Sequence, residues 1–257
     1  MVSRTSRKKN KGKERKAKKE ETERVRKRLA WWGFAGEKKT ERTYIRCNHG
    51  LGDIPMSDNQ GLIPNDSDHP ILNFLDDFLG NVQVNFPPEN LFIASRPHTT
   101  ILKNSAYREI IVNAMIKMGT NMMLLTNGDS ISLSVLSLAK SICVLEHYVD
   151  SMNAALSNRE VQTKLRDLHT GSRRDALKFY SKRVSCSCLK SMHQEARRTE
   201  PKMGRCHHCK KEKERVALSV CSRCMITQYC SKECHVAHWS EHKVDCDKLA
   251  ANLLFDN

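Results

Sequence analysis

Between residues 105 and 149, apolar residues recur at helical spacing in two successive runs. The first run is Ile111, Met115, Met118, Met122 and Leu125, and the second is Ile131, Val135, Leu138, Ile142, Leu145 and Val149. Both runs repeat every three or four residues, the period of an amphipathic helix with one apolar face. The polar segment 126–129, with a glycine, separates them. The pattern therefore predicts a hairpin of two antiparallel helices, in which Gly119 weakens the first helix and the methionines face the core.

Other elements are predicted on both sides of this hairpin. A short helix is expected over 69–80, ended by Gly80, and residues 81–86 alternate as a strand would until Pro87 and Pro88 stop it. Helical patterns continue over 159–169 and 172–184. We expect a basic tail over 1–45, a loop-rich region with the short helix over 46–104, a helical region over 105–185 and a polar linker over 186–203. The fold class is therefore mainly α, a helical body of αα-hairpin character followed by a small module over 204–248.

Charge is concentrated at the beginning of the chain. Of the net charge of +15, the first 28 residues carry +10, from 14 Lys and Arg against four acids. With almost no apolar residues, such a segment cannot offset its ordering entropy, so we expect a tail that is disordered when alone and transiently helical. Three interpretations remain open: a nuclear import signal, RNA or DNA binding through phosphate neutralisation, and a solubilising tail.

Targeting and membrane signals are not evident in the sequence. The opening residues are polar and charged, without the apolar segment of a secretory signal, and no stretch approaches the length of an uncharged membrane span. We therefore expect a reducing compartment, the nucleus or the cytoplasm, with the nucleus favoured by the basic run. Clustered cysteines in such compartments more often bind metal than form disulfides.

Near the C-terminus, potential metal ligands occur in four close pairs. They are Cys206 and Cys209, Cys221 and Cys224, Cys230 and Cys234, and His242 and Cys246. A C-x2-C pair directs both sulfurs at one Zn²⁺, and residues four apart on a helix share a face. Eight ligands complete two tetrahedral sites without an open position, which is typical of structural rather than catalytic zinc. A segment this small rarely builds a sufficient core unaided, so metal binding is expected to supply much of its folding free energy.

This pattern resembles the MYND-type zinc finger over residues 206–246. Besides the eight ligands, the match includes Tyr229-Cys230-Ser231 and the ending at His238-Trp239, His242-Lys243 and Cys246. The resemblance implies two interleaved sites. One zinc would be bound by Cys206, Cys209, Cys230 and Cys234, and the other by Cys221, Cys224, His242 and Cys246.

The resemblance also implies a non-catalytic docking module, in some members for short proline-rich peptides. In the family a Gln often follows the sixth ligand and a Trp comes four residues later, and both are linked to peptide capture. Here the Trp position is Trp239, but the Gln position is His235, a departure from the family pattern. Trp239 has an alternative role, packing on the module's own helix.

The remaining cysteines and histidines are weaker candidates. Cys186 and Cys188, with His193, would form a third metal site only through C-x-C, which is a poor chelate geometry beside C-x2-C. Cys47 and Cys143 are the other cysteines outside the four pairs. Cys143 and His147 are four apart, but Cys143 borders an apolar stripe where free cysteine is commonly buried. His207 and His208 are expected to be exposed loop residues. His238 is too far from Cys246 along a helix to share its metal.

These observations predict a zinc-binding adaptor, not an enzyme, whose MYND-type module docks partner proteins or peptides. The alternative is an RNA- or DNA-associated protein acting through residues 1–28. A SET/MYND-type lysine methyltransferase is less favoured, because only 11 residues follow Cys246 and no SET-like motif, P-loop or nucleophile elbow is present. No membrane partner and no small-molecule substrate are expected.

Overall fold

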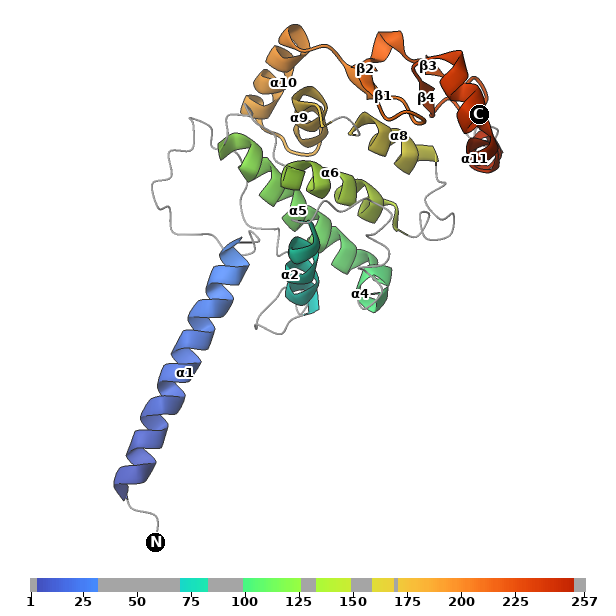
Figure 1. The fold of residues 1–257 in the computed structure, drawn as a ribbon. Coiled ribbons are helices and arrows are strands. Elements are labelled where there is room, and N and C mark those ends of the chain that lie inside the picture. Colours follow the sequence, from blue (N-terminus) through green and yellow to red (C-terminus); the bar gives the residue numbers. More distant parts are fainter. Residues whose placement is uncertain are drawn as a thin grey trace.

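The computed structural model describes residues 4–31, 70–82, 99–125, 133–148, 159–168 and 171–251. Figure 1 shows a group of packed helices, a long N-terminal helix that projects away from it, and a small module with short strands at the C-terminal end. Within the described residues the chain is mainly helical, as predicted. None of the described helices is long and apolar enough to cross a membrane.

The basic segment forms helix α1 (Arg4–Trp31), where we expected a tail that is only transiently helical. Lys, Arg, Glu and Ala are strong helix formers, and the ion pairs Arg24–Glu21 and Arg26–Glu23 join neighbouring turns. The side chains of α1 that the structure describes, over 13–27, are nearly all exposed, so this part of the helix has no buried face to stabilise it. Disorder of this segment in isolation stays a prediction.

The predicted hairpin is present as α5 (Ser105–Leu125) and α6 (Leu133–Glu146). Their buried side chains include Ile111, Met115, Leu138 and Ile142, and Met118 and Met122 pack against the same core, so the methionines have the expected role. Opposite its apolar run, the second helix carries Ser134, Ser137 and Ser141, and this side is not simply solvent-facing, because Ser141 is buried. The reason is that α6 lies between α5 on one side and α8 and α9 on the other (Figure 1).

α5 continues through Gly119 although glycine has a low helix propensity. A Cβ atom at Gly119 would lie 2.1 Å from the Tyr180 hydroxyl oxygen, so the glycine leaves room for this buried ring. Tyr180 comes from α9 (Arg173–Ser181), and its hydroxyl donates a hydrogen bond to the Val135 carbonyl of α6 at 3.0 Å. The glycine thus joins three helices by allowing one aromatic side chain between them.

The region predicted to be loop-rich contributes two short helices to the body. α2 (Pro70–Val82) confirms the predicted helix, extends past Gly80, and buries Ile71, Leu72, Phe74 and Leu75. The predicted strand over 81–86 is wrong for residues 81 and 82, which belong to the last turn of this helix. α2 as a whole contacts α5 and α6, so a helix and not a strand packs on the body here. Residues 83–86 lie outside the described residues, as does the predicted turn at 126–129. A second short helix, α4 (Thr99–Lys103), precedes α5.

The predicted polar linker over 186–203 is wrong. Most of it is helix α10 (Ser187–Thr199), which packs against α9 and buries Leu189 and Ala196. These residues and Met192 lie at i, i+3 and i+7, a narrow apolar face within a polar segment. Cys186 precedes the helix, and its sulfur accepts a hydrogen bond from the Leu189 amide at 3.5 Å. The helices predicted over 159–169 and 172–184 are confirmed as α8 (Arg159–Asp167) and α9.

The C-terminal module contains two small antiparallel sheets and one helix. β1 (Met203–Arg205) pairs with β2 (Glu212–Glu214), and β3 (Ser219–Val220) pairs with β4 (Gln228–Tyr229). A 3-10 turn, η2 (Arg215–Ala217), connects the two sheets, and α11 (Lys232–Ala251) ends the described part. The small core of this module consists mainly of cysteines, with Ile226, Tyr229 and Leu249.

Candidate metal centre

Two tight turns with the same backbone geometry present the first four cysteines. The Lys210 amide donates to the Cys206 carbonyl at 3.0 Å, and the Met225 amide donates to the Cys221 carbonyl at 2.9 Å. Lys210 and Met225, each directly after the second cysteine of its pair, have positive φ angles of 61° and 58°. Each C-x2-C segment therefore folds back on itself and directs both sulfurs to one side, as expected for a zinc knuckle.

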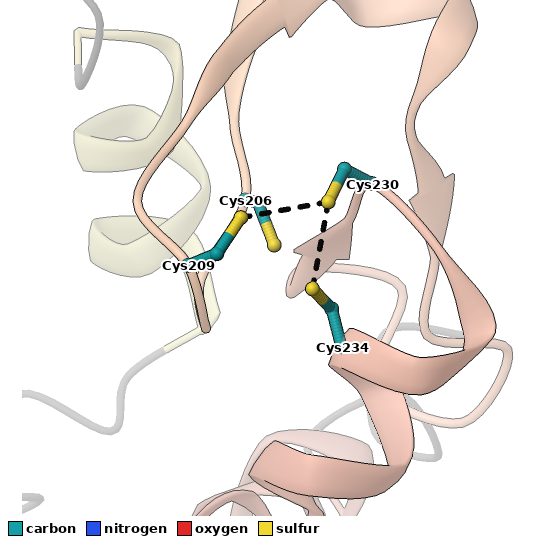
Figure 2. A group of neighbouring side chains, drawn as sticks. All are labelled: Cys206, Cys209, Cys230 and Cys234. Carbon is teal, nitrogen blue, oxygen red and sulfur yellow. Dashed lines mark hydrogen bonds between the residues drawn. The ribbon is translucent and has the colours of Figure 1, made fainter.

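The first cluster combines one knuckle with the beginning of α11. The sulfur atoms of Cys206, Cys209, Cys230 and Cys234 all lie within 4.8 Å of one another (Figure 2). The Cys230 sulfur is 3.5 Å from those of both Cys209 and Cys234. A tetrahedral Zn²⁺ with bonds of about 2.3 Å separates its sulfur ligands by roughly 3.8 Å, whereas a disulfide needs about 2 Å. The four thiols therefore fit a metal ion and not a disulfide.

The second cluster combines the other knuckle with the middle of α11. Its ligand atoms, from Cys221, Cys224, His242 and Cys246, also lie within 4.8 Å of one another, and all four residues are buried. The Cys221 and Cys246 sulfurs are 3.8 Å apart, and the Cys224 sulfur is 3.6 Å from His242 Nε2. Both predicted ligand sets are thus brought together, in the interleaved arrangement that the family resemblance implied.

Thr227 orients the histidine ligand, a role that the sequence analysis missed. His242 Nδ1 lies 3.3 Å from the Thr227 hydroxyl, which leaves Nε2 directed at the Cys224 sulfur. Burial and the neighbouring His238 and His235 lower the pKa of His242, so the neutral ring that metal binding requires is favoured. A polar second partner of this kind typically fixes the ring orientation of a metal-binding histidine.

The ionisation of the thiols also suits a cation. Burial opposes the thiolate of Cys206, but backbone amides of Cys230, Cys209 and His208 outweigh it and lower the pKa to about 6. At Cys224 burial is likewise outweighed, by the backbone amides of Thr227 and Ile226, and the pKa is lowered. By contrast, hydrogen bonds to Cys209 and Cys234 raise the pKa of Cys230 to about 12. In the second cluster, burial raises the pKa of Cys246 to about 12. Each cluster therefore contains one thiol that ionises more readily and one that resists further negative charge, a combination that a divalent cation relieves.

A row of aromatic rings lies beside the clusters on α11. His235 stacks on Tyr229 at 4.5 Å between ring centroids and contacts Trp239 edge-on at 5.9 Å. His238 Nδ1 lies 3.1 Å from the Tyr229 hydroxyl, and His238 belongs to neither ligand cluster. Trp239 is 36% exposed, while the Nε2 atom of His235 is buried without a hydrogen-bond partner.

Of the two histidines in the first knuckle, His208 is exposed as predicted, but the prediction is wrong for His207. The Gln228 amide donates to His207 Nδ1 at 3.0 Å, and the His207 amide donates to the Gln228 carbonyl at 2.9 Å. His207 therefore links the first knuckle to β4. Its contact with Gln228 spans 21 residues, which no local pattern in the sequence indicated.

The other cysteines do not join a metal cluster in the described part of the chain. Cys143 lies in the helical core, where burial raises its pKa to about 12, and His147 contacts Glu160 and Lys164 instead. Cys188 packs against the helical core beside Cys186. Cys47 lies outside the described residues.

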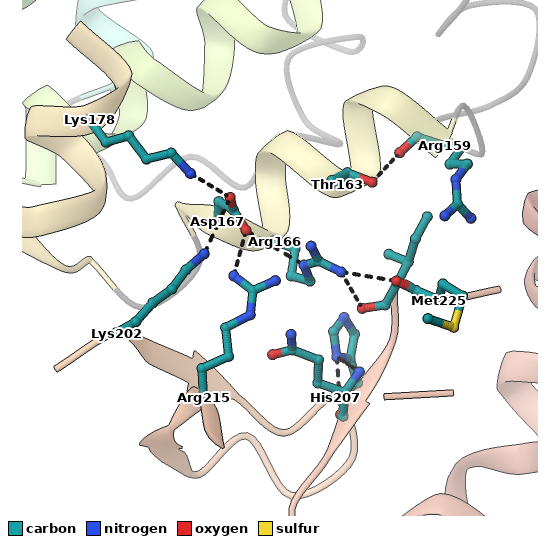
Figure 3. A network of polar contacts seen from close by, with 11 residues as sticks. Arg159, Thr163, Arg166, Asp167, Lys178, Lys202, His207, Arg215 and Met225 are labelled. Atoms are coloured by element: carbon teal, nitrogen blue, oxygen red, sulfur yellow. Dashed lines mark hydrogen bonds and ion pairs between the residues drawn. The ribbon is translucent and has the colours of Figure 1, made fainter. Parts of the chain in front are cut away.

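The C-terminal module, called the finger from here on, is attached to the helical body through α8. Arg159 donates to the Cys224 carbonyl. Arg166 donates to the carbonyls of Met225 and Ile226 at 3.1 and 3.4 Å (Figure 3). Two arginines of the body therefore bind consecutive carbonyls of the second knuckle.

Asp167 completes this attachment from the end of α8. Its carboxylate lies 2.7 Å from Arg215 of the finger, 3.4 Å from Lys178 and 3.9 Å from Lys202. The finger is therefore held against the body by specific polar contacts, not only by the chain that connects them.

Comparison with known proteins identifies one segment of the chain. A family model described as the MYND finger matches residues 206–246, the span that contains both clusters. Searches of curated proteins and of solved structures gave no match for this chain. The spacing, the two interleaved clusters and the family match agree, and the C-terminal segment 206–246 of this chain is a MYND finger with two ligand clusters that fit zinc binding.

Proposed function

We propose that the protein is a non-catalytic adaptor that docks a partner protein through its MYND finger, with two structural zinc ions. Support for the metal comes from the two clusters, each of which offers four soft or borderline ligands at tetrahedral spacing. Four protein ligands leave no position for a water or substrate on the ion, so the proposed zinc stabilises the fold and does no chemistry.

The observation that carries the docking proposal is the distribution of exposed apolar side chains. Within the described residues, the large exposed hydrophobics all lie in the finger, and α11 contributes Val236 at 67%, Val244 at 61% and Trp239 at 36% exposed. At 100° per residue these three positions fall on one side of the helix. Exposed apolar side chains gathered on one small module are typical of a protein interaction site.

His235 and Trp239 supply a second, polar feature of this surface. Trp239 offers an aromatic edge, and the buried Nε2 of His235 lacks a partner beside it. Aromatic residues are enriched among the residues that dominate binding energy in interfaces. We infer that the occupant is a short apolar protein segment that also presents a hydrogen-bonding group to His235.

The experiment is affinity capture with the full, zinc-loaded chain, followed by a binding measurement on each captured protein. Trp239→Ala combined with Val236→Ser should weaken the binding of a genuine partner at least tenfold while leaving zinc content unchanged. The matched control is Val216→Ser, which removes an apolar side chain that is 91% exposed but lies outside α11. Equal binding by all three proteins would contradict docking on α11.

Binding of RNA or DNA by α1 is a second candidate, supported by the exposed cations of that helix. Such binding should be insensitive to sequence and fall steeply with salt, because it depends on displaced counterions. Deletion of residues 4–28 should abolish it, and the same deletion tests whether the basic run directs the chain to the nucleus instead of the cytoplasm. Unchanged RNA and DNA affinity after the deletion would remove this candidate.

A further inference from the structure

Two rows of basic residues, one on α9 and the other on α10, lie on either side of one hollow. Arg174, Lys178 and Lys182 are four residues apart along α9 and its end, so they lie on one side of that helix. His193 and Arg197 are four apart on α10, and Lys202 follows that helix. All six residues line the same hollow, which has a volume of about 350 Å³. This volume is within the range of about 300–1,000 Å³ that is usual for small-molecule sites.

Several of these charges are not used by the fold. Lys182 and Arg197 form no ion pair or side-chain hydrogen bond with the described residues, and Arg174 donates to a neutral carbonyl, that of Glu200. Lys178 and Lys202 share one carboxylate, Asp167, at 3.4 and 3.9 Å. Five formal positive charges therefore line a hollow to which the protein contributes few counter-charges.

The pKa of His193 reflects the positive charges around the hollow. Burial, followed by the nearby charges of Arg197, Lys178, Arg174 and Lys182, lowers its pKa, so the ring does not add a further charge near neutral pH. Like charges four residues apart on a helix, such as Arg174 and Lys178, destabilise that helix. Lys182 and Arg197 are exposed, and an anionic ligand in the hollow would offset the repulsion between these cations.

Asp175 indicates a second property that a ligand of the hollow needs, besides negative charge. This residue is only 3% exposed, it lines the hollow, and its Oδ2 atom is buried without a hydrogen-bond partner. A buried oxygen without a hydrogen-bond partner destabilises the fold. A ligand that carries only anionic oxygens would bring them against this carboxylate, but a ligand with a hydroxyl could donate to it.

Arg197 also borders an adjoining hollow of about 440 Å³ with Gln194 and Arg198. A ligand with more than one phosphate can therefore contact cations on both sides of Arg197. Arginine binds phosphate oxygens in a bidentate fashion, and lysine binds them as a point charge.

From these observations we propose that the hollow between α9 and α10 binds a phosphorylated polyol, with Arg174, Lys182 and Arg197 on its phosphates and Asp175 accepting from a hydroxyl. A soluble polyol phosphate and the headgroup of an inositol lipid share this chemistry. The site is separate from the metal clusters and does not depend on the proposed adaptor function.

Calorimetry on the full, zinc-loaded chain tests the proposal, with soluble inositol trisphosphate as one probe. The second probe is phosphatidylcholine vesicles that contain phosphatidylinositol bisphosphate. Saturable binding of the soluble probe alone would identify a free ligand, and tight binding of these vesicles would identify the lipid headgroup. Lys182→Gln with Arg197→Gln should weaken the affinity at least tenfold.

Two further variants distinguish a built site from general attraction to positive charge. Lys18→Gln with Lys19→Gln removes the same charge from exposed positions of α1 and should leave the affinity unchanged. Asp175→Asn removes the negative charge that repels phosphate and replaces the carboxylate that accepts from a hydroxyl with a weaker acceptor. It should therefore improve the binding of inorganic pyrophosphate, which has no carbon-bound hydroxyl, relative to that of inositol trisphosphate.

Three results would overturn the proposal. One is equal affinity in the wild type and the Lys182 and Arg197 double variant. Another is equal binding to vesicles that carry phosphatidylserine at matched charge, which would indicate unspecific attraction. The third is binding of single-stranded RNA through Arg197 without any binding of either inositol probe, which would assign the hollow to a different class of ligand.

Discussion

The Asp167 carboxylate accepts a hydrogen bond from Arg215 Nη1 at 2.7 Å, and this contact joins α8 of the helical body to the finger. Burial raises the pKa of Asp167, but Arg215, Lys202 and Lys178 outweigh it and hold the pKa below its ordinary value. A carboxyl of this kind stabilises the folded chain at neutral pH. The contribution is lost as the pH falls from about 4 through the folded-state pKa, because the unfolded chain binds the proton more readily.

We therefore expect Asp167→Asn to lower the free energy of unfolding at pH 7 by about 1–3 kcal/mol, since four cations, Arg166, Lys178, Lys202 and Arg215, lose their shared partner. The difference from the wild type should shrink below about pH 4. Urea unfolding at both pH values measures it. Asp247→Asn is the control, because its pair with Arg223 at 2.7 Å is about half exposed and should contribute at most about 1 kcal/mol. Equal losses in both variants would contradict a special role for Asp167.

Gly119→Ala tests the packing of Tyr180 between the helices. Helix propensity alone predicts a gain of about 1 kcal/mol from this substitution. We expect instead a loss of about 1–3 kcal/mol, because the added methyl group would lie 2.1 Å from the Tyr180 hydroxyl oxygen. Thermal unfolding gives the sign directly. Tyr180→Leu in the Gly119→Ala background should recover part of the loss, and an increase in stability from the single substitution would show that the ring moves aside at little cost.

Metal analysis tests the two clusters independently of any partner. The purified chain should contain two zinc ions, and a strong chelator should abolish the folded signals of residues 206–246 while the helical body remains folded. Cys246→Ser should remove one equivalent, because it takes a ligand from the second cluster. Cys188→Ser is the matched control and should retain both equivalents, since Cys188 packs against the helical core.

The contact between α8 and the second knuckle should affect how fast the second metal is lost. Arg166 bonds the carbonyls of Met225 and Ile226, so Arg166→Ala should free the knuckle and accelerate chelator extraction of one zinc by roughly tenfold. Arg223→Ala changes an arginine of the same knuckle that bonds only Asp247 among the described residues, and it should leave the rate unchanged. Similar extraction rates for all three proteins would show that the body does not stabilise the knuckle.

The sequence was most informative where the chemistry is local. The metal ligands could be predicted one by one, because C-x2-C and residues four apart on a helix determine geometry within a single turn. The α5–α6 hairpin followed from apolar spacing, a signal that also belongs to neighbouring residues. α10 was missed because only Leu189, Met192 and Ala196 mark its apolar face within a polar segment.

Features that depend on distant segments could not be predicted in this way. The bond between Arg166 and Ile226 spans 60 residues, and that between Asp167 and Arg215 spans 48. In the sequence, Arg166, Asp167 and Arg215 each resemble an ordinary surface charge. The same applies to Gly119, whose role depends on a tyrosine from a third helix. Long-range polar contacts, and the close approach of Tyr180 to Gly119, depend on how the helices pack. A periodic pattern of apolar residues does not predict them.

The alternating order of the ligands along the chain has a consequence for how the finger is assembled. Once an ion joins Cys206 and Cys209 to Cys230 and Cys234, the segment with Cys221 and Cys224 is confined to a closed loop. Much of the loop-closure entropy for the second site has then already been lost. Loading should therefore be cooperative, so that a sample given one equivalent of zinc contains filled and empty fingers with few half-loaded ones.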